Sequence, residues 1–229
     1  MLKTYMVNID SNLENDAFNR LLNYVSEDKK VKIHRFYHFE DSQRALIGNV
    51  LSRYALCKNL NIKNVDITFG ANEYGKPFLL GADKIHFNIS HSGNWVVCAI
   101  SDNPVGIDVE TIKPTDFEIA KRFFSEDEYT ALKSQHDDEK QTYFYKLWTL
   151  KESYIKAVGK GLSIPLDSFT VSVENNNIIN SNESISGYSL YHSSLDSNSL
   201  YAICSKTIAS HEKTIFNVIQ FFHEVCNSL

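Results

Sequence analysis

The sequence predicts an α+β protein, organised either as one large domain or as two similar halves. Its 229 residues, 43% of them hydrophobic, are enough to form a core in either arrangement. Short segments of alternating polarity, typical of strands, occur between longer stretches whose apolar residues have helical spacing. The order of these segments is weakly repeated along the chain. Together these observations predict strands and helices mixed within each part of the protein.

In the first part of the chain, strand-like segments surround one long helical stretch. Apolar or alternating residues predict strands at 4–9, 66–69, 85–89 and 95–100, with turns at 72–77 and 91–94. Apolar residues at helical spacing predict helices at 14–26 and 40–60. A basic segment containing Lys29 and Lys32 lies between the two helices.

The second part of the chain begins with a predicted strand at 105–110 and a connector at 111–122 that opens into a short helix. Ser125 and Glu128 have the spacing of a capping box, which predicts a helix that begins there and ends near residue 134. A long helix is predicted from about 143 to 158, ending at Gly159. The later predictions are strands at 169–173, 178–179 and 200–204, an exposed hairpin around 188–191, and a C-terminal strand or short helix.

A weak internal repeat links the two parts. The tripeptide Arg-Phe-Tyr at 35–37 resembles Arg-Phe-Phe at 122–124, and each is followed by Glu-Asp and then by a long predicted helix. Each long helix is followed later by an apolar strand with a cysteine, Cys98 or Cys204. A duplication and a chance similarity both remain open on these residues alone. If the duplication is real, a ligand site is expected in the cleft between the halves.

The composition excludes several classes of protein. Charged residues make up 22% and the formal net charge is −5, so nucleic acid is not an expected partner. No apolar run of about 20 residues is present to span a membrane, and the N-terminal apolar run is too short for a signal peptide. The four cysteines are far apart in the sequence and predict free thiols. We therefore expect a cytoplasmic protein.

Two acids stand on one face of the predicted strand at 105–110. Because successive side chains of a strand point to opposite faces, Asp108 and Glu110 share a face, and their charges repel each other. A divalent cation such as Mg²⁺ would offset this repulsion. A solvated strand edge with two unrelated acids is the alternative.

The second long predicted helix offers a further acid. Trp148, Glu152 and Lys156 are spaced i, i+4 and i+8, so they lie along one stripe of the helix. Glu152 and Lys156 form either an ordinary surface pair or part of a site. In a site, Glu152 would be a third carboxylate for Mg²⁺ and Lys156 would reach a phosphate oxygen.

Other polar residues suggest phosphate binding. Ser90 and His91 precede Gly93 at the end of a predicted strand, where hydroxyl, imidazole and backbone N–H groups can bind phosphate. A plain hairpin turn is the alternative, and a Ser–His nucleophile pair is weaker because G-x-S-x-G is absent. The candidate phosphate-binding cations, each of which is otherwise an ordinary surface residue, are Lys29, Lys32, Arg44 and Lys76. The two common Gly-rich nucleotide loops are absent.

Taken together, these motifs resemble those of the 4′-phosphopantetheinyl transferases. The motifs that carry the resemblance are Gly-Lys-Pro at 75–77, Asn-Ile-Ser-His-Ser at 88–92, Val-Gly-Ile-Asp-Val-Glu at 105–110 and Trp-x-x-Lys-Glu-x-x-x-Lys at 148–156. The resemblance covers nearly the whole chain. It is closest to the larger, monomeric type that activates surfactin synthetase and similar peptide synthetases.

The resemblance implies a pseudo-dimer of two similar α+β halves, 1–104 and 105–229, linked at about 105–122, with the active site in the cleft between them. It implies coenzyme A as substrate and Mg²⁺, with Mn²⁺ possible, as the metal. The implied metal ligands are Asp108, Glu110 and Glu152, and the implied catalytic residues are Glu152 and Lys156. The implied coenzyme A-binding residues are Lys29, Lys32, Arg44, Lys76, Ser90, His91 and Lys156.

The implied reaction transfers 4′-phosphopantetheine to a serine of an apo peptidyl or acyl carrier protein, which activates peptide, polyketide or fatty-acid synthases, as in nonribosomal peptide and antibiotic biosynthesis. The carrier is expected to dock near 111–124, where Lys113, Lys121 and Arg122 alternate with Phe117 and Phe123. A solvated connector is the alternative for this segment. Two other functions remain open, a Mg²⁺-dependent nucleotide pyrophosphohydrolase and a non-catalytic coenzyme A- or carrier-binding module.

Overall fold

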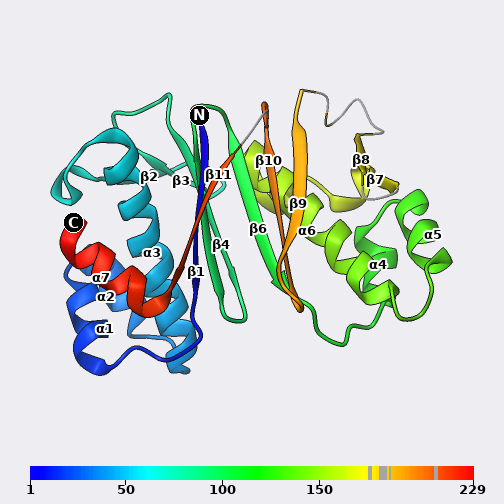
Figure 1. The fold of residues 1–229 in the computed structure, drawn as a ribbon. Helices are drawn as coiled ribbons and strands as arrows, with labels where there is room; N and C mark the ends of the chain where they lie inside the picture. The colour runs from blue at the N-terminus through cyan, green and yellow to red at the C-terminus, as the bar shows by residue number, and fades with distance from the viewer. Residues whose placement is uncertain (175–176, 181–184, 186, 209–210) are drawn as a thin grey trace. The chain divides into compact units, whose positions relative to one another are not determined.

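The computed structural model describes residues 1–174, 177–180, 185, 187–208 and 211–229 (Figure 1). The chain divides into two compact units. The first unit consists of Met1–Gly70, Pro77–Asp102 and His211–Leu229, and the second of Ala71–Lys76 and Asn103–Ser210. Both units combine strands and helices, so the predicted α+β class is confirmed. Along the described residues, every helix is too short or too polar to cross a membrane.

The first unit is built on a four-stranded sheet of order β11-β1-β5-β4. Its strands are β1 (Leu2–Asn8), β4 (His86–Ser92), β5 (Trp95–Ser101) and β11 (Glu212–Asn217). β1 pairs in parallel with β11 and antiparallel with β5, which pairs antiparallel with β4. The helices of this unit are α1 (Asn15–Leu22), α2 (Glu27–Ile33), α3 (Phe39–Leu60) and α7 (Val218–Ser228). A short 3-10 helix, η1 (Asn64–Asp66), and the small β2–β3 hairpin (Phe69–Ala71 and Pro77–Leu79) follow α3.

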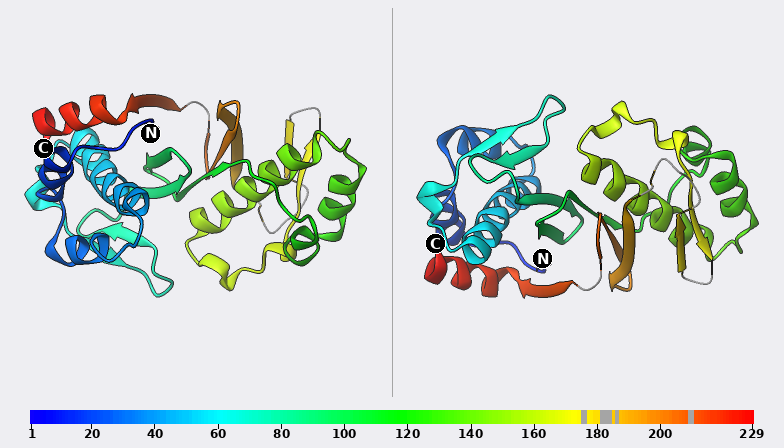
Figure 2. Two further views of the ribbon diagram at one scale, coloured as in Figure 1. Left: turned by 90° about the horizontal axis from the view of Figure 1, so that it is seen from below. Right: turned by 90° about the horizontal axis from the view of Figure 1, so that it is seen from above.

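The long helix α3 organises the core of the first unit. Its apolar residues Leu46, Val50 and Tyr54 are fully buried, and they belong to the same cluster as Val96 and Cys98 of β5. Figure 2 shows α3 along the sheet from two further sides. The helix ends at Asn61, which has a left-handed backbone (φ 53°), as expected for a residue that stops a helix.

The second unit is built on the three-stranded sheet β6-β10-β9 and the long helix α6. Its main strands are β6 (Val105–Thr111), β9 (Ser189–Asp196) and β10 (Ser199–Ser205), and β7 (Val171–Glu174) with β8 (Asn177–Asn180) forms a separate hairpin. Its helices are α4 (Glu118–Phe123), α5 (Glu126–Ser134), α6 (Lys140–Val158), η2 (Gly161–Ser163) and η3 (Leu166–Ser168). α6 packs against both β6 and β10. The central strand β10 is buried throughout, and β6 and β9 pair with it on either side.

Several sequence predictions are confirmed. The helices predicted at 40–60 and 143–158 correspond to α3 and α6, and the strands predicted at 95–100 and 105–110 correspond to β5 and β6. Both hydrogen bonds of the predicted capping box are present: Ser125 N donates to Glu128 Oε2 at 2.8 Å, and Glu128 N donates to Ser125 Oγ at 3.4 Å. Gly159, with φ 80°, ends α6 as predicted.

Other predictions are wrong. The strand predicted at 66–69 is displaced, because the chain first forms η1 and pairs only from Phe69 onward. His91, placed in a turn, lies in β4, which extends through Ser92 by pairing with β5. The exposed hairpin predicted around 188–191 does not form there, because Ser189–Asp196 is a single strand paired with β10.

The C-terminal segment contains more secondary structure than the sequence predicts. The C-terminal residues form both a strand, β11, and a helix, α7. His211–Leu229 belongs to the first compact unit and Ala71–Lys76 to the second. The division into halves 1–104 and 105–229 stays a prediction. Residues 175–176 of the turn predicted at 174–177, together with 181–184, lie outside the described residues.

Candidate functional site

A glycine at the start of β6 brings this strand and α6 unusually close together. A Cβ atom placed on Gly106 would lie 2.0 Å from the carbonyl oxygen of Ser153 and 2.4 Å from the backbone nitrogen of Ala157. Both are backbone atoms of α6, so no side-chain rotation could relieve the clash. Gly106 therefore permits the close approach that places the acids of β6 beside the polar residues of α6.

The acids and the lysine predicted from the sequence meet at this contact. Lys156 Nζ donates to Asp108 Oδ1 at 2.5 Å. The Asp108 side chain is 4% exposed and that of Lys156 is 26% exposed. Glu152 is half-buried one turn earlier on α6, and Glu110 is half-buried two residues after Asp108 on β6. The structure thus brings together a cation and carboxylates that are far apart in the sequence.

The charges of this group act on each other. Burial, and then the negative charge of Asp108, raise the pKa of the Glu152 carboxyl above its ordinary value; Lys156 lowers it, and Glu110 raises it further. Two neighbouring carboxylates therefore oppose the ionisation of Glu152. A further positive charge in the group would relieve this opposition.

The side chains around Asp108 are the ones that the sequence implies as ligands of a divalent cation. Among the described residues, no group of three or more His, Cys, Asp and Glu is arranged to hold a metal ion. In this structure the ammonium of Lys156 supplies the positive charge at Asp108. The chemistry of the donors nevertheless fits Mg²⁺, a hard cation that takes carboxylate oxygens, and the two acids that raise the pKa of Glu152 are Asp108 and Glu110. That Asp108, Glu110 and Glu152 bind the ion stays a prediction.

Lys76 holds the end of α6. Its ammonium donates to the carbonyl oxygens of Lys156 at 2.6 Å, Val105 at 3.0 Å and Ala157 at 3.3 Å. Asn72, in the same hairpin loop, donates to the carbonyl of Gly159 at 2.7 Å. A positive charge is favourable at the last carbonyls of a helix. Lys76 therefore ties the start of β6 to the last turn of α6, and its role toward coenzyme A stays a prediction.

A second polar group lies in the first unit, at the turn between β4 and β5. Arg44 of α3 donates to the carbonyl of Gly93 at 3.0 Å and to Asp41 Oδ1 at 2.6 Å. The hydrogen bond from Arg44 lowers the pKa of Asp41, and the charge of His91 contributes. Ser90 is 9% exposed whereas His91 is exposed, as expected for neighbours on a strand. Arg44 and His91 therefore both lie near Asp41 at this turn.

Two further predicted cations lie on α2. The hydrogen bond from Ser26 and the charges of Lys29 and Lys32 lower the pKa of Asp28. Lys32 is exposed and Lys29 is half-buried. Their role in binding coenzyme A stays a prediction.

The predicted docking segment 111–124 is partly anchored in the core of the second unit. The Phe117 ring lies 6.1 Å from that of Phe144, and the Phe123 ring lies 5.7 Å from that of Trp148. Lys121 and Arg122 are exposed, and Ile119 is 43% exposed. The segment therefore presents cations and one apolar side chain, while its phenylalanines hold it in place.

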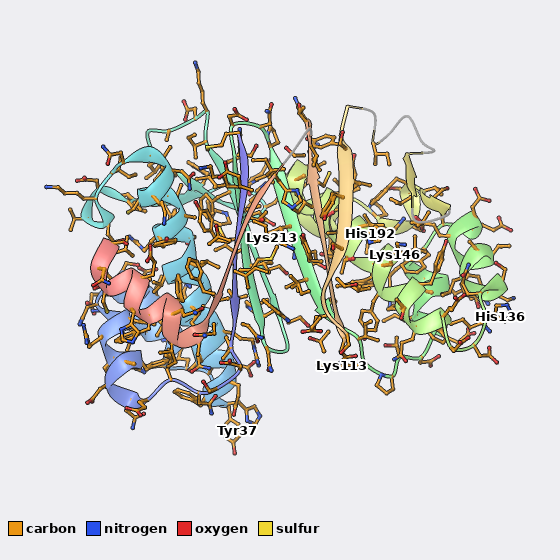
Figure 3. The ribbon with its side chains drawn as sticks, viewed as in Figure 1. Tyr37, Lys113, His136, Lys146, His192 and Lys213 are labelled. Carbon is orange, nitrogen blue, oxygen red and sulfur yellow. The ribbon has the colours of Figure 1, made fainter. Side chains whose placement is uncertain are left out.

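One pair of basic residues in the second unit, Lys146 and His192, was not predicted from the sequence. Figure 3 shows Lys146 of α6 and His192 of β9 close together. Burial, and then the charge of Lys146, lower the pKa of His192 to about 4. His192 is therefore neutral at neutral pH, and burial also lowers the pKa of Lys146.

Sequence reasoning also missed the roles of Gly106 and Lys76. Gly106 stands in the quoted motif, and a glycine inside a buried strand is a general signal for a close backbone approach. The contact of Lys76 with α6 had no comparable signal, because it joins residues 80 positions apart.

A family model described as "4'-phosphopantetheinyl transferase superfamily" matches residues 104–204. A second model, described as "4'-phosphopantetheinyl transferase, N-terminal", matches residues 12–103. The first match contains β6 and α6, and therefore Asp108, Glu152 and Lys156.

Curated proteins of the same description are similar over most of their length. A 4'-phosphopantetheinyl transferase of Bacillus subtilis is 49% identical over 170 residues, which cover 74% of this chain and 76% of that protein. The 4'-phosphopantetheinyl transferase Sfp of Bacillus subtilis (strain 168) is 48% identical with the same coverage. The 4'-phosphopantetheinyl transferase gsp of Aneurinibacillus migulanus is 46% identical, covering 75% of this chain and 71% of that protein.

Proposed function

The chain belongs to the 4′-phosphopantetheinyl transferase family, and from this premise we propose that it moves 4′-phosphopantetheine from coenzyme A to a serine hydroxyl of an apo carrier protein. The observation that carries the proposal is the Asp108–Lys156 ion pair beside Glu152. It assembles charged groups from two separate motifs at one place, within the segment that matches the family.

The proposed reaction is a phosphoryl-type transfer. The serine oxygen forms a bond to the β-phosphorus of coenzyme A, and the bond from that phosphorus to the leaving adenosine 3′,5′-bisphosphate breaks. Positioning and charge neutralisation account for most of the catalysis of such transfers. The chain therefore has to hold two substrates, accept one proton and place positive charge near the pyrophosphate.

Glu152 is the proposed general base that accepts the serine proton. Its pKa is raised by burial and by Asp108, and a base is more effective when its pKa lies closer to the working pH. Lys156 is the proposed cation for the pyrophosphate. Its side chain is 26% exposed and already holds its charge at the site.

Asp108, Glu110 and Glu152 are the proposed ligands of Mg²⁺ or Mn²⁺. When bound, the ion would neutralise negative charge on the pyrophosphate. Lys156 donates to Asp108, and the lysine is proposed to turn toward the phosphates of coenzyme A. Its four-carbon stem and partial exposure permit that movement.

Recognition of the two substrates is proposed from the charged surfaces of each unit. Lys29, Lys32, Arg44, Ser90 and His91 are proposed to bind coenzyme A. The carrier is proposed to dock on 111–124, where Lys113, Lys121 and Arg122 are exposed. The pseudo-dimeric relation of the halves, the cleft, the monomeric state and the cytoplasmic location stay predictions.

One experiment tests this function. The protein is incubated with coenzyme A, Mg²⁺ and an apo peptidyl carrier protein, and the intact mass of the carrier is measured. A gain of one phosphopantetheine supports transfer. Release of bisphosphate without this gain supports hydrolysis, and no release supports a binding module. A carrier whose acceptor serine is replaced by alanine is the matched control, and Glu152→Gln must be slower than the wild type.

A further inference from the structure

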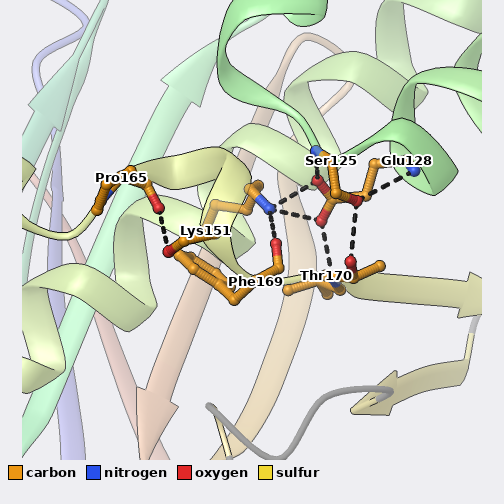
Figure 4. A network of polar contacts seen from close by, with 8 residues as sticks. Ser125, Glu128, Lys151, Pro165, Phe169 and Thr170 are labelled. Carbon is orange, nitrogen blue, oxygen red and sulfur yellow. Dashed lines mark hydrogen bonds and ion pairs between the residues drawn. The ribbon is translucent and has the colours of Figure 1, made fainter.

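A buried ion pair between α5 and α6 anchors α6. Figure 4 shows this pair and its network of polar contacts. Lys151 Nζ donates to Glu128 Oε1, to Glu128 Oε2 and to the carbonyl oxygen of Phe169, each at 2.6 Å. The side chains of Lys151 and Glu128 are 0% and 1% exposed. The ammonium thus has three acceptors for its three N–H bonds, with no need for water.

Both carboxylate oxygens of Glu128 accept further hydrogen bonds from the backbone. Its Oε1 accepts from the backbone nitrogen of Val171 at 2.7 Å, and its Oε2 accepts from the backbone nitrogen of Ser125 at 2.8 Å. The same side chain therefore closes the capping box of α5, fixes the start of β7 and receives Lys151 of α6. The ammonium also lies 4.2 Å from the centre of the Phe169 ring. Three elements are joined at one charge pair.

The pair is better explained by geometry than by stability. Removing two charges from water is costly, and apolar residues of similar volume often stabilise a protein as well or better. Hydrogen bonds, unlike apolar contacts, are directional, and five of them meet here. Three of them are made by Lys151 and set the rotation of α6 about its own axis. The other two hold Glu128 against the backbone at Ser125 and Val171.

That rotation determines where the site residues point. Glu152 directly follows Lys151, and Lys156 lies five residues after it on the same helix. Near these residues α6 contacts the backbone of β6 at Gly106, where the approach leaves no space for a Cβ atom. The helix is therefore fixed by two contacts, one to β6 and one to the buried pair.

We propose that Lys151 and Glu128 are positioning residues for the transfer reaction: they orient α6 so that Glu152 and Lys156 reach the reacting groups. Neither residue touches substrate in this assignment. The inference rests on the transfer activity proposed above, and it concerns the turnover rate rather than the binding of coenzyme A.

The test is the double variant Lys151→Met/Glu128→Leu. Each single variant leaves one buried charge without its partner and is expected to be unstable, whereas the double variant removes both charges. We expect the double variant to fold with a Tm at or above that of the wild type. We expect kcat to fall on the order of 10²-fold, because small displacements of reacting groups have effects of that size. The KM for coenzyme A is expected to change less than about threefold, since the substituted residues contact no substrate.

The control is Leu132→Ala, at a residue of α5 that is 1% exposed and outside the network. It should lower Tm and keep kcat at temperatures where the protein is folded. If the wild type does not modify the carrier, the proposed function itself is wrong, and this failure is distinct from a failure of the Lys151–Glu128 positioning role. If the wild type transfers, a double variant that does not fold, or that folds and keeps the wild-type kcat, overturns the positioning role.

Discussion

The ammonium of Lys156 and the carboxylate of Asp108 form a 2.5 Å contact whose two partners differ in exposure, 26% against 4% of the side chain. The carboxylate is held in the protein interior, whereas the lysine can extend its charge toward water. Glu152 adds a second negative charge nearby. The contact is therefore asymmetric, and the two residues should not be equivalent when removed.

We predict that Lys156→Met is more destabilising than Asp108→Asn in metal-free protein. Loss of the lysine leaves a buried carboxylate beside other acids, with an expected loss on the order of 3 kcal/mol in the free energy of unfolding. Loss of the acid leaves a lysine that can turn to solvent, with an expected loss of about 1 kcal/mol. Urea unfolding in the presence of a chelator measures both values.

Added Mg²⁺ should then restore more stability to Lys156→Met than to the wild type, because the ion competes with no ammonium there. Lys140→Met is the control, since it breaks an ion pair in which Asp137 is 97% exposed and should change stability little. Equal losses for the two site variants, or the reverse order, would contradict the asymmetry.

A second prediction concerns the titration of Glu152. Burial and Asp108 raise its pKa in the folded chain. Between the ordinary pKa and this raised pKa, the folded chain keeps a proton that the unfolded chain has lost. Stability from this group is therefore fully present below the ordinary pKa and is lost as pH rises through the folded pKa. In metal-free protein, raising the pH from about 4 to about 7 should cost the wild type stability that Glu152→Gln does not lose.

Denaturant unfolding across this range, with both proteins in chelator, gives the comparison. Groups remote from Glu152 titrate equally in the two proteins, so only the difference between the curves matters. Curves that stay parallel would show that Glu152 titrates normally. With Asp108→Asn as background, the difference should become smaller, because one of the charges that raise the pKa is gone.

A third prediction tests the close approach of β6 and α6. Gly106→Ala places a methyl group 2.0 Å from the Ser153 carbonyl oxygen, so α6 must shift. We expect a loss of about 2–3 kcal/mol in the free energy of unfolding and a fall in transfer rate on the order of 10²-fold. The matched control is Gly48→Ala in α3, where the nearest atom to a new Cβ is a side-chain methyl of Ile89 at 3.4 Å. An active, stable Gly106→Ala protein would contradict the role of Gly106.

The sequence predicts this site better than it predicts the architecture around it. Asp108 and Glu110 follow from strand alternation, and Glu152 and Lys156 from helical spacing, because both patterns are local. Strand pairing is not local: β11 pairs with β1 across more than 200 residues, and no pattern in either segment specifies that partner. The sequence therefore gives no sign that His211–Leu229 belongs to the first compact unit. The division into halves 1–104 and 105–229 stays a prediction.

The same distinction explains what was missed within the site. Lys151 and Glu128 lie in recognisable helices, and Glu128 was identified as a cap. Nothing in either helix indicates that the two side chains form a buried pair 23 positions apart. From the sequence alone, Lys76 is expected to be a surface cation in the turn at 72–77. Only the folded structure shows that its ammonium donates to carbonyl oxygens of α6.

A last prediction follows from that placement of Lys76. Burial lowers its pKa from the ordinary 10.5 to about 8. Between these values the unfolded chain binds a proton that the folded chain has released. Stability from this group is therefore present above the ordinary pKa and is lost as pH falls through about 8.

We expect the free energy of unfolding of the wild type, relative to Lys76→Met, to rise as pH increases from about 8 toward 10.5. Denaturant unfolding of both proteins at several pH values measures the difference and cancels the titration of tyrosines and cysteines. Lys160→Met, at an exposed lysine of the same region, should follow the wild type throughout. A constant difference between the wild type and Lys76→Met would mean that the three carbonyl oxygens keep Lys76 charged across this range, and that burial does not control its titration.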